Sequence, residues 1–264
     1  MSSDLKPQTS TVNGGLWGAR AKDWANLQEG CFRPVYDAVL TRCAVSKATR
    51  YLDAGCGAGM AAQMAAERGA AVTGIDASTA LLEIARSRAP NGDFGVGDLE
   101  ALPYSDDAFD VVTGFNSFQY AGNPIIALGE ARRVTKSEGK LVIMTWGDPA
   151  KMDAALLVTA LRPLMPPPGA PGPFALSDET ALRKFATDAK LTPIETFDVD
   201  SPFTYADEAT GIRALNSSGV AARAMGNTSE AAVTDAHRKA LAPFRQQDGS
   251  YRVSATFRCL LAEP

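Results

Sequence analysis

Residues 51–60, YLDAGCGAGM, decide the fold of this chain. A short apolar strand runs into three glycines at alternate positions, and an alanine-rich helical pattern then continues to Arg68. Glycines in such a loop let the backbone turn tightly and let a ligand approach the chain closely. The order strand, glycine-rich loop, helix is typical of the first unit of a nucleotide-binding α/β sheet.

The same alternation of strand and helix continues as far as residue 146. Ser78 is a helix-capping residue before a helix that ends ahead of Pro90, and Asn123 with Pro124 begins another helix. Repeated strand–helix units imply a parallel, doubly wound sheet. The further strands are predicted at 71–76, 93–98, 109–114 and 140–146.

The second half of the chain has a looser pattern. Its last stretch, YRVSATFRCLLA, alternates apolar and polar residues, which predicts a half-exposed antiparallel strand at the edge of the sheet. The stretch 163–173 is rich in proline and glycine. The other elements predicted here are a helix from 151, a helix at 178–190, a strand at 191–203, and helices at 206–226 and 229–245.

Composition narrows the class of protein. The 264 residues carry a net charge of −4, which argues against a nucleic-acid binder that relies on clustered cations. A single histidine, His237, and four cysteines without CxxC spacing (Cys31, Cys43, Cys56 and Cys259) argue against a structural zinc site. The sequence predicts a cytoplasmic protein that does not insert into a membrane. The cysteines are scattered, the N-terminus is polar without a signal-peptide pattern, and no apolar run is long enough for a membrane span.

Three acids follow the predicted strands. Asp53 precedes the glycines, Asp76 ends the second strand and Asp98 ends the third. Because the carboxyl ends of parallel strands meet at one edge, these acids would surround one crevice, where Asp76 can accept ribose hydroxyls. The crevice would favour a cationic ligand and repel a pyrophosphate. Met60 also stands where the dinucleotide fingerprint has its third glycine, so an NAD(P)-dependent oxidoreductase is the weaker interpretation.

Residues 50–147 resemble the class I S-adenosyl-L-methionine (SAM)-dependent methyltransferases, in particular the group called methyltransferase type 11. The resemblance rests on LDAGCGAG, GIDAS, GDLEALPYSDDAFDVV and EARRVTKSEGKLVIMTW. It implies a Rossmann-like, mostly parallel seven-stranded sheet with an antiparallel last strand. The expected organisation is a disordered tail at 1–15 and one domain at 16–264, with lid helices at 16–49, the SAM-binding core at 50–147 and a helical substrate cap at about 204–246.

The resemblance also implies which residues hold the methionine end of SAM. Asp53 and the backbone of Gly55, Cys56 and Gly57 are expected to bind the methionine part, and Asn116 is expected beside it and the transferred methyl group. The sulfonium and ammonium groups of SAM agree with an acidic crevice on electrostatic grounds.

The nucleoside end of SAM is expected to contact the two later strand ends. By resemblance, Asp76 binds the ribose hydroxyls and Ala77 borders the adenine. Asp98 accepts a hydrogen bond from the adenine amine, with the backbone of Leu99 beside it.

The N-terminal segment LWGARAKDWANLQ is a candidate lid. Helical spacing puts Trp17, Arg20 and Trp24 on one face, and an arginine on an apolar face is costly unless it is paired. One interpretation pairs Arg20 with the SAM carboxylate while the tryptophans close over the cofactor. The alternative is a packing helix whose Arg20 reaches water or pairs with Asp23 or Glu29.

The predicted reaction is direct in-line transfer of the SAM methyl group to a small-molecule acceptor, with S-adenosyl-L-homocysteine as product and no metal. Such a displacement depends on proximity and orientation and needs no dedicated catalytic residue. No catalytic group is therefore selected among the polar candidates, which are Tyr36, Gln119, Tyr120, Tyr205 and His237.

The acceptor itself is read only coarsely from the sequence. The 200–245 segment has no phosphate-binding cluster of cations, so we expect a neutral or weakly polar molecule. An apolar acceptor pocket is predicted from the cap residues Phe174, Phe203, Tyr205, Met225 and Phe244. The alternative function is a SAM-binding protein that does not transfer methyl, acting as a sensor or in other SAM-assisted chemistry.

Overall fold

Strands and helices alternate through the first half of the chain in a computed structural model that describes residues 9–167 and 172–264. The strands are β1 (Arg50–Ala54), β2 (Ala71–Asp76), β3 (Asp93–Val96), β4 (Phe109–Phe115), β5 (Thr135–Trp146), β6 (Thr192–Asp200), β7 (Phe203–Tyr205), β8 (Tyr251–Val253) and β9 (Thr256–Glu263). The helices are α1 (Thr9–Gly18), α2 (Ala21–Asp23), α3 (Arg33–Arg42), α4 (Met60–Glu67), α5 (Thr79–Arg88), α6 (Pro124–Val134), α7 (Ala154–Thr159), α8 (Glu179–Asp188), α9 (Glu208–Leu215), α10 (Gly219–Asn227) and α11 (Glu230–Leu241).

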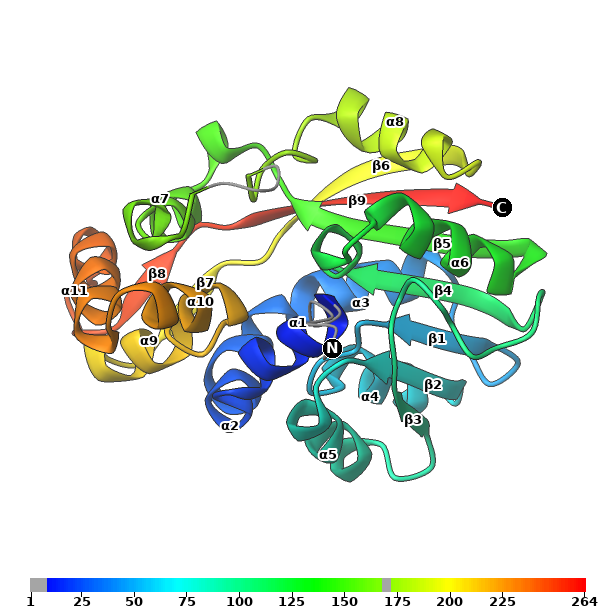
Figure 1. Ribbon diagram of the computed structural model, residues 1–264, viewed down its shortest axis with the longest axis horizontal. Helices are drawn as coiled ribbons and strands as arrows, with labels where there is room; N and C mark the ends of the chain where they lie inside the picture. Colours follow the sequence, from blue (N-terminus) through cyan, green and yellow to red (C-terminus); the bar gives the residue numbers. More distant parts are fainter. Residues whose placement is uncertain (1–8, 168–171) are drawn as a thin grey trace, which may run out of the picture.

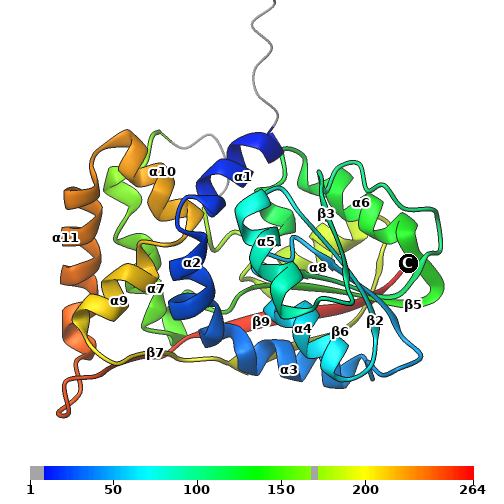
Figure 2. The same ribbon diagram turned by 90° about the horizontal axis from the view of Figure 1, so that it is seen from below.

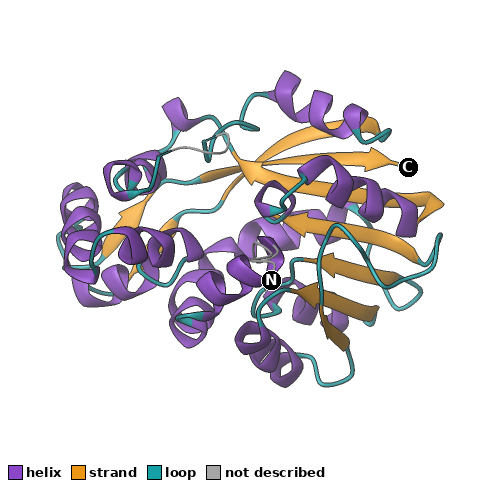
Figure 3. Cartoon of the chain, viewed as in Figure 1, coloured by secondary structure: helices purple, strands orange, loops and turns teal. Residues whose placement is uncertain are grey.

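Seven strands form one sheet in the order β3-β2-β1-β4-β5-β9-β6, with helices on both faces (Figures 1 and 3). The pairs from β3 to β5 are parallel, whereas β9 runs antiparallel to both β5 and β6. This confirms the predicted Rossmann-like sheet of seven strands with an antiparallel last strand.

The core lies on both faces of the sheet because successive side chains of a strand point to opposite sides. On β1, Tyr51 packs into the cluster that includes Leu40 of α3, and Leu52 packs into the cluster that includes Leu128 of α6. Both tyrosine and leucine are fully buried, which explains why the central strands read as short continuous apolar runs.

The helix starts were predictable from capping residues. Ser78 precedes α5 and its hydroxyl accepts a hydrogen bond from the Leu81 amide at 3.3 Å. Asn123 caps α6 in the same way, with Pro124 at the first helical position. Both caps are as predicted, and they fix where the strand–helix loops turn at the site edge of the sheet.

The cap helices α7, α9, α10 and α11 gather at one end of the molecule, beside the two-stranded β7–β8 sheet (Figure 1). The N-terminal helices lie between this cap and α5, as Figure 2 shows: α1 contacts α10 and α5, and α2 contacts α5. The first helices of the chain thereby span the gap between the sheet and the cap.

The last strand differs from the prediction. The stretch 251–262 is two strands, of which β8 pairs with β7, while β9 lies inside the large sheet between β5 and β6. Its polar residues find partners there instead of solvent: Arg258 forms an ion pair with Asp198 on β6 at 2.7 Å. The alternation of polar and apolar residues was real, but the predicted edge position was wrong.

Two other boundaries also differ. Helix α1 begins at Thr9, so the disordered tail predicted at 1–15 is too long; residues 1–8 lie outside the described residues, as do 168–171 of the proline-rich stretch. The helix predicted at 206–226 is two helices, because Ser218 starts a new one by capping the Ala221 amide. Within the described ranges, no helix is both long and apolar enough to cross a bilayer.

Candidate active site

A cavity lies at the carboxyl ends of β1, β2 and β4, beneath the N-terminal helical segment. Ten of the eleven predicted site residues line it, and only Arg20 does not. Those ten are Trp17, Asp53, Gly55, Cys56, Gly57, Asp76, Ala77, Asp98, Leu99 and Asn116. The structure therefore brings together residues from four loops; which part of a ligand each one holds stays a prediction.

The glycine loop has the backbone conformation that its sequence indicates. Gly55 and Gly57 have φ of +80° and +53°, in the left-handed region that side chains disfavour. A Cβ on Gly55 would also lie 2.4 Å from the Cβ of Ser117, so that position has no room for a side chain. The amides of Gly55 and Cys56 both donate to the carbonyl of Ile75, which ties the loop to β2.

Asp76 bridges the two loops that follow β1 and β2. Its Oδ2 accepts a hydrogen bond from the Gly57 amide at 2.9 Å, and its Oδ1 accepts one from the Ser78 amide at 2.8 Å. Burial raises the pKa of this carboxyl, and the backbone hydrogen bonds oppose the rise. An ionised carboxylate has about four acceptor positions, so further donors can still bind it from the cavity.

Asp53 is the most deeply buried acid of the cavity, with 1% of its surface exposed. Desolvation raises its pKa to about 8, against a hydrogen bond from the Thr113 hydroxyl at 3.3 Å. The negative charges of Glu29 and Asp76 raise this pKa further. A cation bound here would restore the charge balance of the site.

Asp98 and Leu99 lie just beyond the end of β3 and line the cavity. The Oδ1 of Asp98 accepts a hydrogen bond from the Glu100 amide at 3.0 Å, which holds the turn after the strand. Asn116, at the end of β4, adopts φ of +55°, and its amide donates to the carbonyl of Met144 on β5. Asparagine tolerates this left-handed conformation better than most residues.

The N-terminal segment covers the cavity. Ser10, Asn13 and Trp17 of α1 line it, so part of the predicted tail belongs to the site. The indole of Trp17 packs edge-on against Trp24, with ring centroids 5.1 Å apart. Helix α1 rests directly on the loop after β2: a Cβ on Gly14 would lie 2.2 Å from the carbonyl oxygen of Ala77.

Arg20 does not join this group. The helix breaks between α1 and α2, where Arg20 has non-helical φ and ψ of −134° and 42°, so it leaves the face that carries Trp17. Its guanidinium pairs instead with Glu230, at the start of α11, at 2.6 Å. Neither predicted alternative partner is correct, because Asp23 pairs with Arg213 and Glu29 pairs with another arginine.

Glu29 is a cavity residue that sequence reasoning assigned only as a partner of Arg20. It is 2% exposed, and it forms an ion pair with Arg88 at the end of α5. Its Oε1 also accepts a hydrogen bond from the Met60 amide, at 3.3 Å, at the start of α4. Arg88 donates to the carbonyls of Ala58 in the glycine loop and Ala25 in the N-terminal segment. This buried pair ties the cover to the glycine loop.

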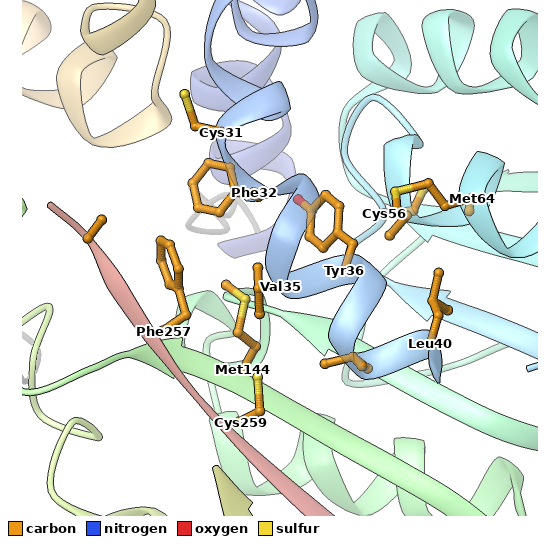
Figure 4. Packing of buried hydrophobic residues seen from close by; sticks show 14 of the residues in the cluster. Cys31, Phe32, Val35, Tyr36, Leu40, Cys56, Met64, Met144, Phe257 and Cys259 are labelled. Atoms are coloured by element: carbon orange, nitrogen blue, oxygen red, sulfur yellow. The ribbon is translucent and has the colours of Figure 1, made fainter. Parts of the chain in front are cut away.

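An apolar wall was also missed. Trp24, Phe32, Tyr36, Phe115 and Met144, which we call the aromatic wall, line the cavity next to Asn116. Figure 4 shows Phe32 and Tyr36 in the same buried cluster as Met144 and Phe257. Phe115 is the last residue of β4, and Met144 lies two residues before the end of β5. Both are apolar residues within apolar strands, so the strand-end rule that selected the acids does not select them.

Two of the five polar catalytic candidates, Tyr36 and Tyr120, line the cavity. His237 is buried in the cap with its Nδ1 2.7 Å from the Oδ1 of Asn216, and burial lowers its pKa to about 4. The hydroxyl of Tyr205 donates to Gln28, and Gln119 donates to Asn116 from outside the lining. None of the predicted apolar cap residues lines this cavity; they are Phe174, Phe203, Tyr205, Met225 and Phe244.

A family model described as a methyltransferase domain matches residues 52–143. Demethylmenaquinone methyltransferase of Renibacterium salmoninarum is 33% identical over 149 residues, which cover 56% of this chain and 58% of that protein. Malonyl-[acyl-carrier protein] O-methyltransferase of Erwinia pyrifoliae is 33% identical over 147 residues, covering 54% of this chain and 55% of that protein. The matched part thus spans little more than half the length of these relatives.

Solved structures extend the likeness beyond the matched core. The structure of the [4+2]-cyclase SpnF has a TM-score of 0.55 and 21% identity, and the match covers 87% of this chain and 80% of the cyclase. At this identity the likeness concerns the fold alone. The glycine loop, the acidic strand ends, the methyltransferase-domain match and the seven-stranded sheet agree with one another, and residues 52–143 therefore form a methyltransferase domain of the class I SAM-dependent type.

Proposed function

We propose that the protein transfers the methyl group of SAM to a small-molecule acceptor by direct in-line displacement. The observation that carries the proposal is one cavity in which Asp53, Asp76 and Asp98 surround a glycine loop and adjoin the aromatic wall. The acids suit a cationic cofactor, and the wall offers an apolar place for a second molecule beside it.

The residues present fit SAM by their chemistry. The cavity lining includes four acids, the three named above and Glu29, and its lining residues within the described chain include no lysine, arginine or histidine. A ligand with a sulfonium and an ammonium group gains from such a lining, whereas a dinucleotide pyrophosphate would be repelled. A Cβ on Gly57 would lie 3.8 Å from both the Oε1 of Glu29 and the Nε1 of Trp24, so the missing side chain leaves that space open to a ligand.

In this proposal, Asp53 and the loop Gly55–Gly57 hold the methionine part, and Asp76 accepts the ribose hydroxyls. Ala77, Asp98 and Leu99 bind the adenine. Bound SAM would supply a methyl group on a positively charged sulfur, already activated for attack. Trp17 and the rest of α1 cover the cavity and exclude water from it.

The protein's contribution to the rate is then mainly positioning. Holding two reactants in line lowers a barrier by about 7–11 kcal/mol without an acid or base. The bond from the acceptor's nucleophilic atom to the methyl carbon forms as the carbon–sulfur bond breaks, and the electron pair of that bond stays on sulfur. The acceptor then loses its proton to water.

Calorimetric titration with SAM, followed by turnover with an acceptor panel that includes quinols, phenols and thioester-linked carboxylates, tests the proposal. The panel reflects the names of the relatives, whose quinone and malonyl-thioester acceptors are carried here as candidates only. Formation of S-adenosyl-L-homocysteine with at least one acceptor is the expected result. Binding of SAM without product from any acceptor would instead favour a SAM-binding protein that does not transfer methyl.

We also propose a cytoplasmic location and a reaction without a resident metal. All four cysteines are free and buried, as expected in a reducing compartment. Retention of activity after dialysis against a chelator is the test for metal independence, and loss of activity that added metal restores would contradict it.

A further inference from the structure

The hydroxyl of Tyr36 is a polar group of the cavity that no contact within the described residues explains. Tyr36 is 7% exposed and lines the cavity from α3, and no hydrogen-bond partner for its hydroxyl occurs among the described residues. Tyrosine hydroxyls this deep in a protein usually have a partner. An unpaired hydroxyl that faces a cavity is therefore available to a ligand.

The surroundings of this hydroxyl are aromatic. The ring of Tyr36 lies 4.6 Å from that of Phe115 in an edge-on arrangement and 6.2 Å from that of Phe32 in a stacked one. Met144 pairs with Phe115 across β4 and β5, and completes the same wall. A flat, apolar molecule would bury its faces against these side chains.

The charges around the wall select against anions. Burial is the main reason that the pKa of Tyr36 lies well above its usual value, and the negative charges of Glu29 and Asp53, which line the same cavity, raise this pKa further. The field that disfavours a tyrosinate at this place disfavours any other anion there. Arg88 is a cation whose charge acts on Tyr36, but its guanidinium is already engaged by Glu29 and two carbonyls.

We propose that the aromatic wall is the acceptor subsite, and that it takes an uncharged aromatic molecule whose oxygen accepts a hydrogen bond from Tyr36. The inference rests on the proposed methyl transfer and narrows it. It moves the acceptor from the cap residues selected in the sequence to the N-terminal segment and the ends of β4 and β5. It also excludes carboxylates and phosphates as preferred acceptors.

The position of the wall agrees with transfer chemistry. Phe115 directly precedes Asn116, which is proposed to adjoin the methyl group, and β4 pairs with β1 at Asp53 and Thr113. A molecule on the wall would therefore lie next to the methionine end of the cofactor. The hydroxyl of Tyr36 is a positioning group here: it holds the acceptor and takes no proton.

The test compares two probes of one shape, 2-naphthol and 2-naphthoate, by calorimetry on the full chain saturated with S-adenosyl-L-homocysteine. Binding of S-adenosyl-L-homocysteine is measured first, so a failure to bind it would count against the proposed function itself. The expected result is that naphthol binds at least about tenfold more tightly than naphthoate, since the anion must approach Glu29 and Asp53. Equal or tighter binding of naphthoate would overturn the inference.

A variant isolates the hydrogen bond. Tyr36→Phe should weaken naphthol about 2- to 10-fold and leave naphthalene unchanged, since one net hydrogen bond is lost. Tyr205→Phe is the matched control: it removes another buried hydroxyl, which donates to Gln28 outside the cavity lining, and should leave both probes unchanged. Equal loss for naphthol and naphthalene in Tyr36→Phe would contradict the assigned hydrogen bond.

Discussion

Replacing Arg88 with methionine should destabilise the protein more than any other single arginine substitution on α5. The side chain is 18% exposed and its partner Glu29 is 3% exposed, so the substitution leaves a buried carboxylate without its cation. Removing one partner of a buried pair costs about 3–5 kcal/mol. The carbonyls of Ala58 and Ala25 also lose a donor. We expect a loss within that range in the free energy of unfolding, measured with urea near neutral pH.

Two further variants make the reasoning testable. Arg86→Met, on the same helix, removes a single hydrogen bond to the carbonyl of Phe94 and should cost about 1 kcal/mol. The double variant Glu29→Gln with Arg88→Met should recover about 2 kcal/mol of the loss, because no unpaired charge remains. An Arg88→Met loss no larger than that of Arg86→Met, or a double variant no more stable than the single one, would refute the ion-pair explanation.

The pH dependence of the Arg88→Met loss has a definite sign. Burial already raises the pKa of Glu29 above 4.5 with Arg88 present, and removing the cation raises it further. A carboxyl whose pKa is raised in the folded state does not lower the free energy of unfolding while it is protonated in both states, and it lowers that free energy as pH rises toward and through the folded-state pKa. The loss should therefore be smallest under acidic conditions and grow toward neutral pH.

Three other variants test the site and the cap. Binding of SAM near pH 7 should release most of one proton, because burial raises the pKa of Asp53 to about 8 and a bound cation lowers this pKa. Calorimetry in buffers of different ionisation enthalpy measures the released proton, and Asp53→Asn should abolish the release. Acidification from about pH 6.5 to about pH 4 should lower the free energy of unfolding of the wild type by on the order of 3 kcal/mol more than that of His237→Asn. The reason is that the imidazole is protonated in the unfolded chain over this range, whereas burial keeps it neutral in the folded protein. Parallel urea titrations that do not diverge would contradict this. Gly14→Ala should weaken SAM binding about tenfold, as its Cβ would meet the carbonyl of Ala77 at 2.2 Å, whereas Gly15→Ala meets nothing within 4 Å and should bind normally; equal affinities would exclude a tight cover.

Much of the sheet and the acidic side of the cavity could be predicted because the signals are local. Strand, glycine loop and capping residue lie within about ten positions of one another, and a parallel sheet brings successive strand ends to one edge. Asp53, Asp76 and Asp98 could therefore be assigned together from the sequence. The conformation of the glycine loop could be predicted from its own residues alone, since glycine is the residue type that readily adopts positive φ angles.

The rest of the site depends on contacts between distant parts of the chain. Arg20 lies more than 200 residues from Glu230, and no local pattern favours that partner over Asp23 or Glu29. Phe115 and Met144 are apolar residues in apolar strands, so their sequence does not say that they face a cavity. The break between β8 and β9 could not be read from the sequence, because both strands have the same two-residue alternation. Only their partners differ: β8 pairs with β7, and β9 pairs with β5.

The arrangement of β7 and β8 has a consequence for how this protein can change. The residues between them, which include α9, α10 and α11, leave and re-enter the fold through two paired strands, with Tyr205 opposite Tyr251. An insertion whose ends lie side by side can be shortened, lengthened or exchanged without altering the sheet to which it is attached. The part of the cap formed by α9, α10 and α11 is thus an exchangeable insertion, and mutations there can accumulate while the strands that carry Asp53 and Asp76 keep their register.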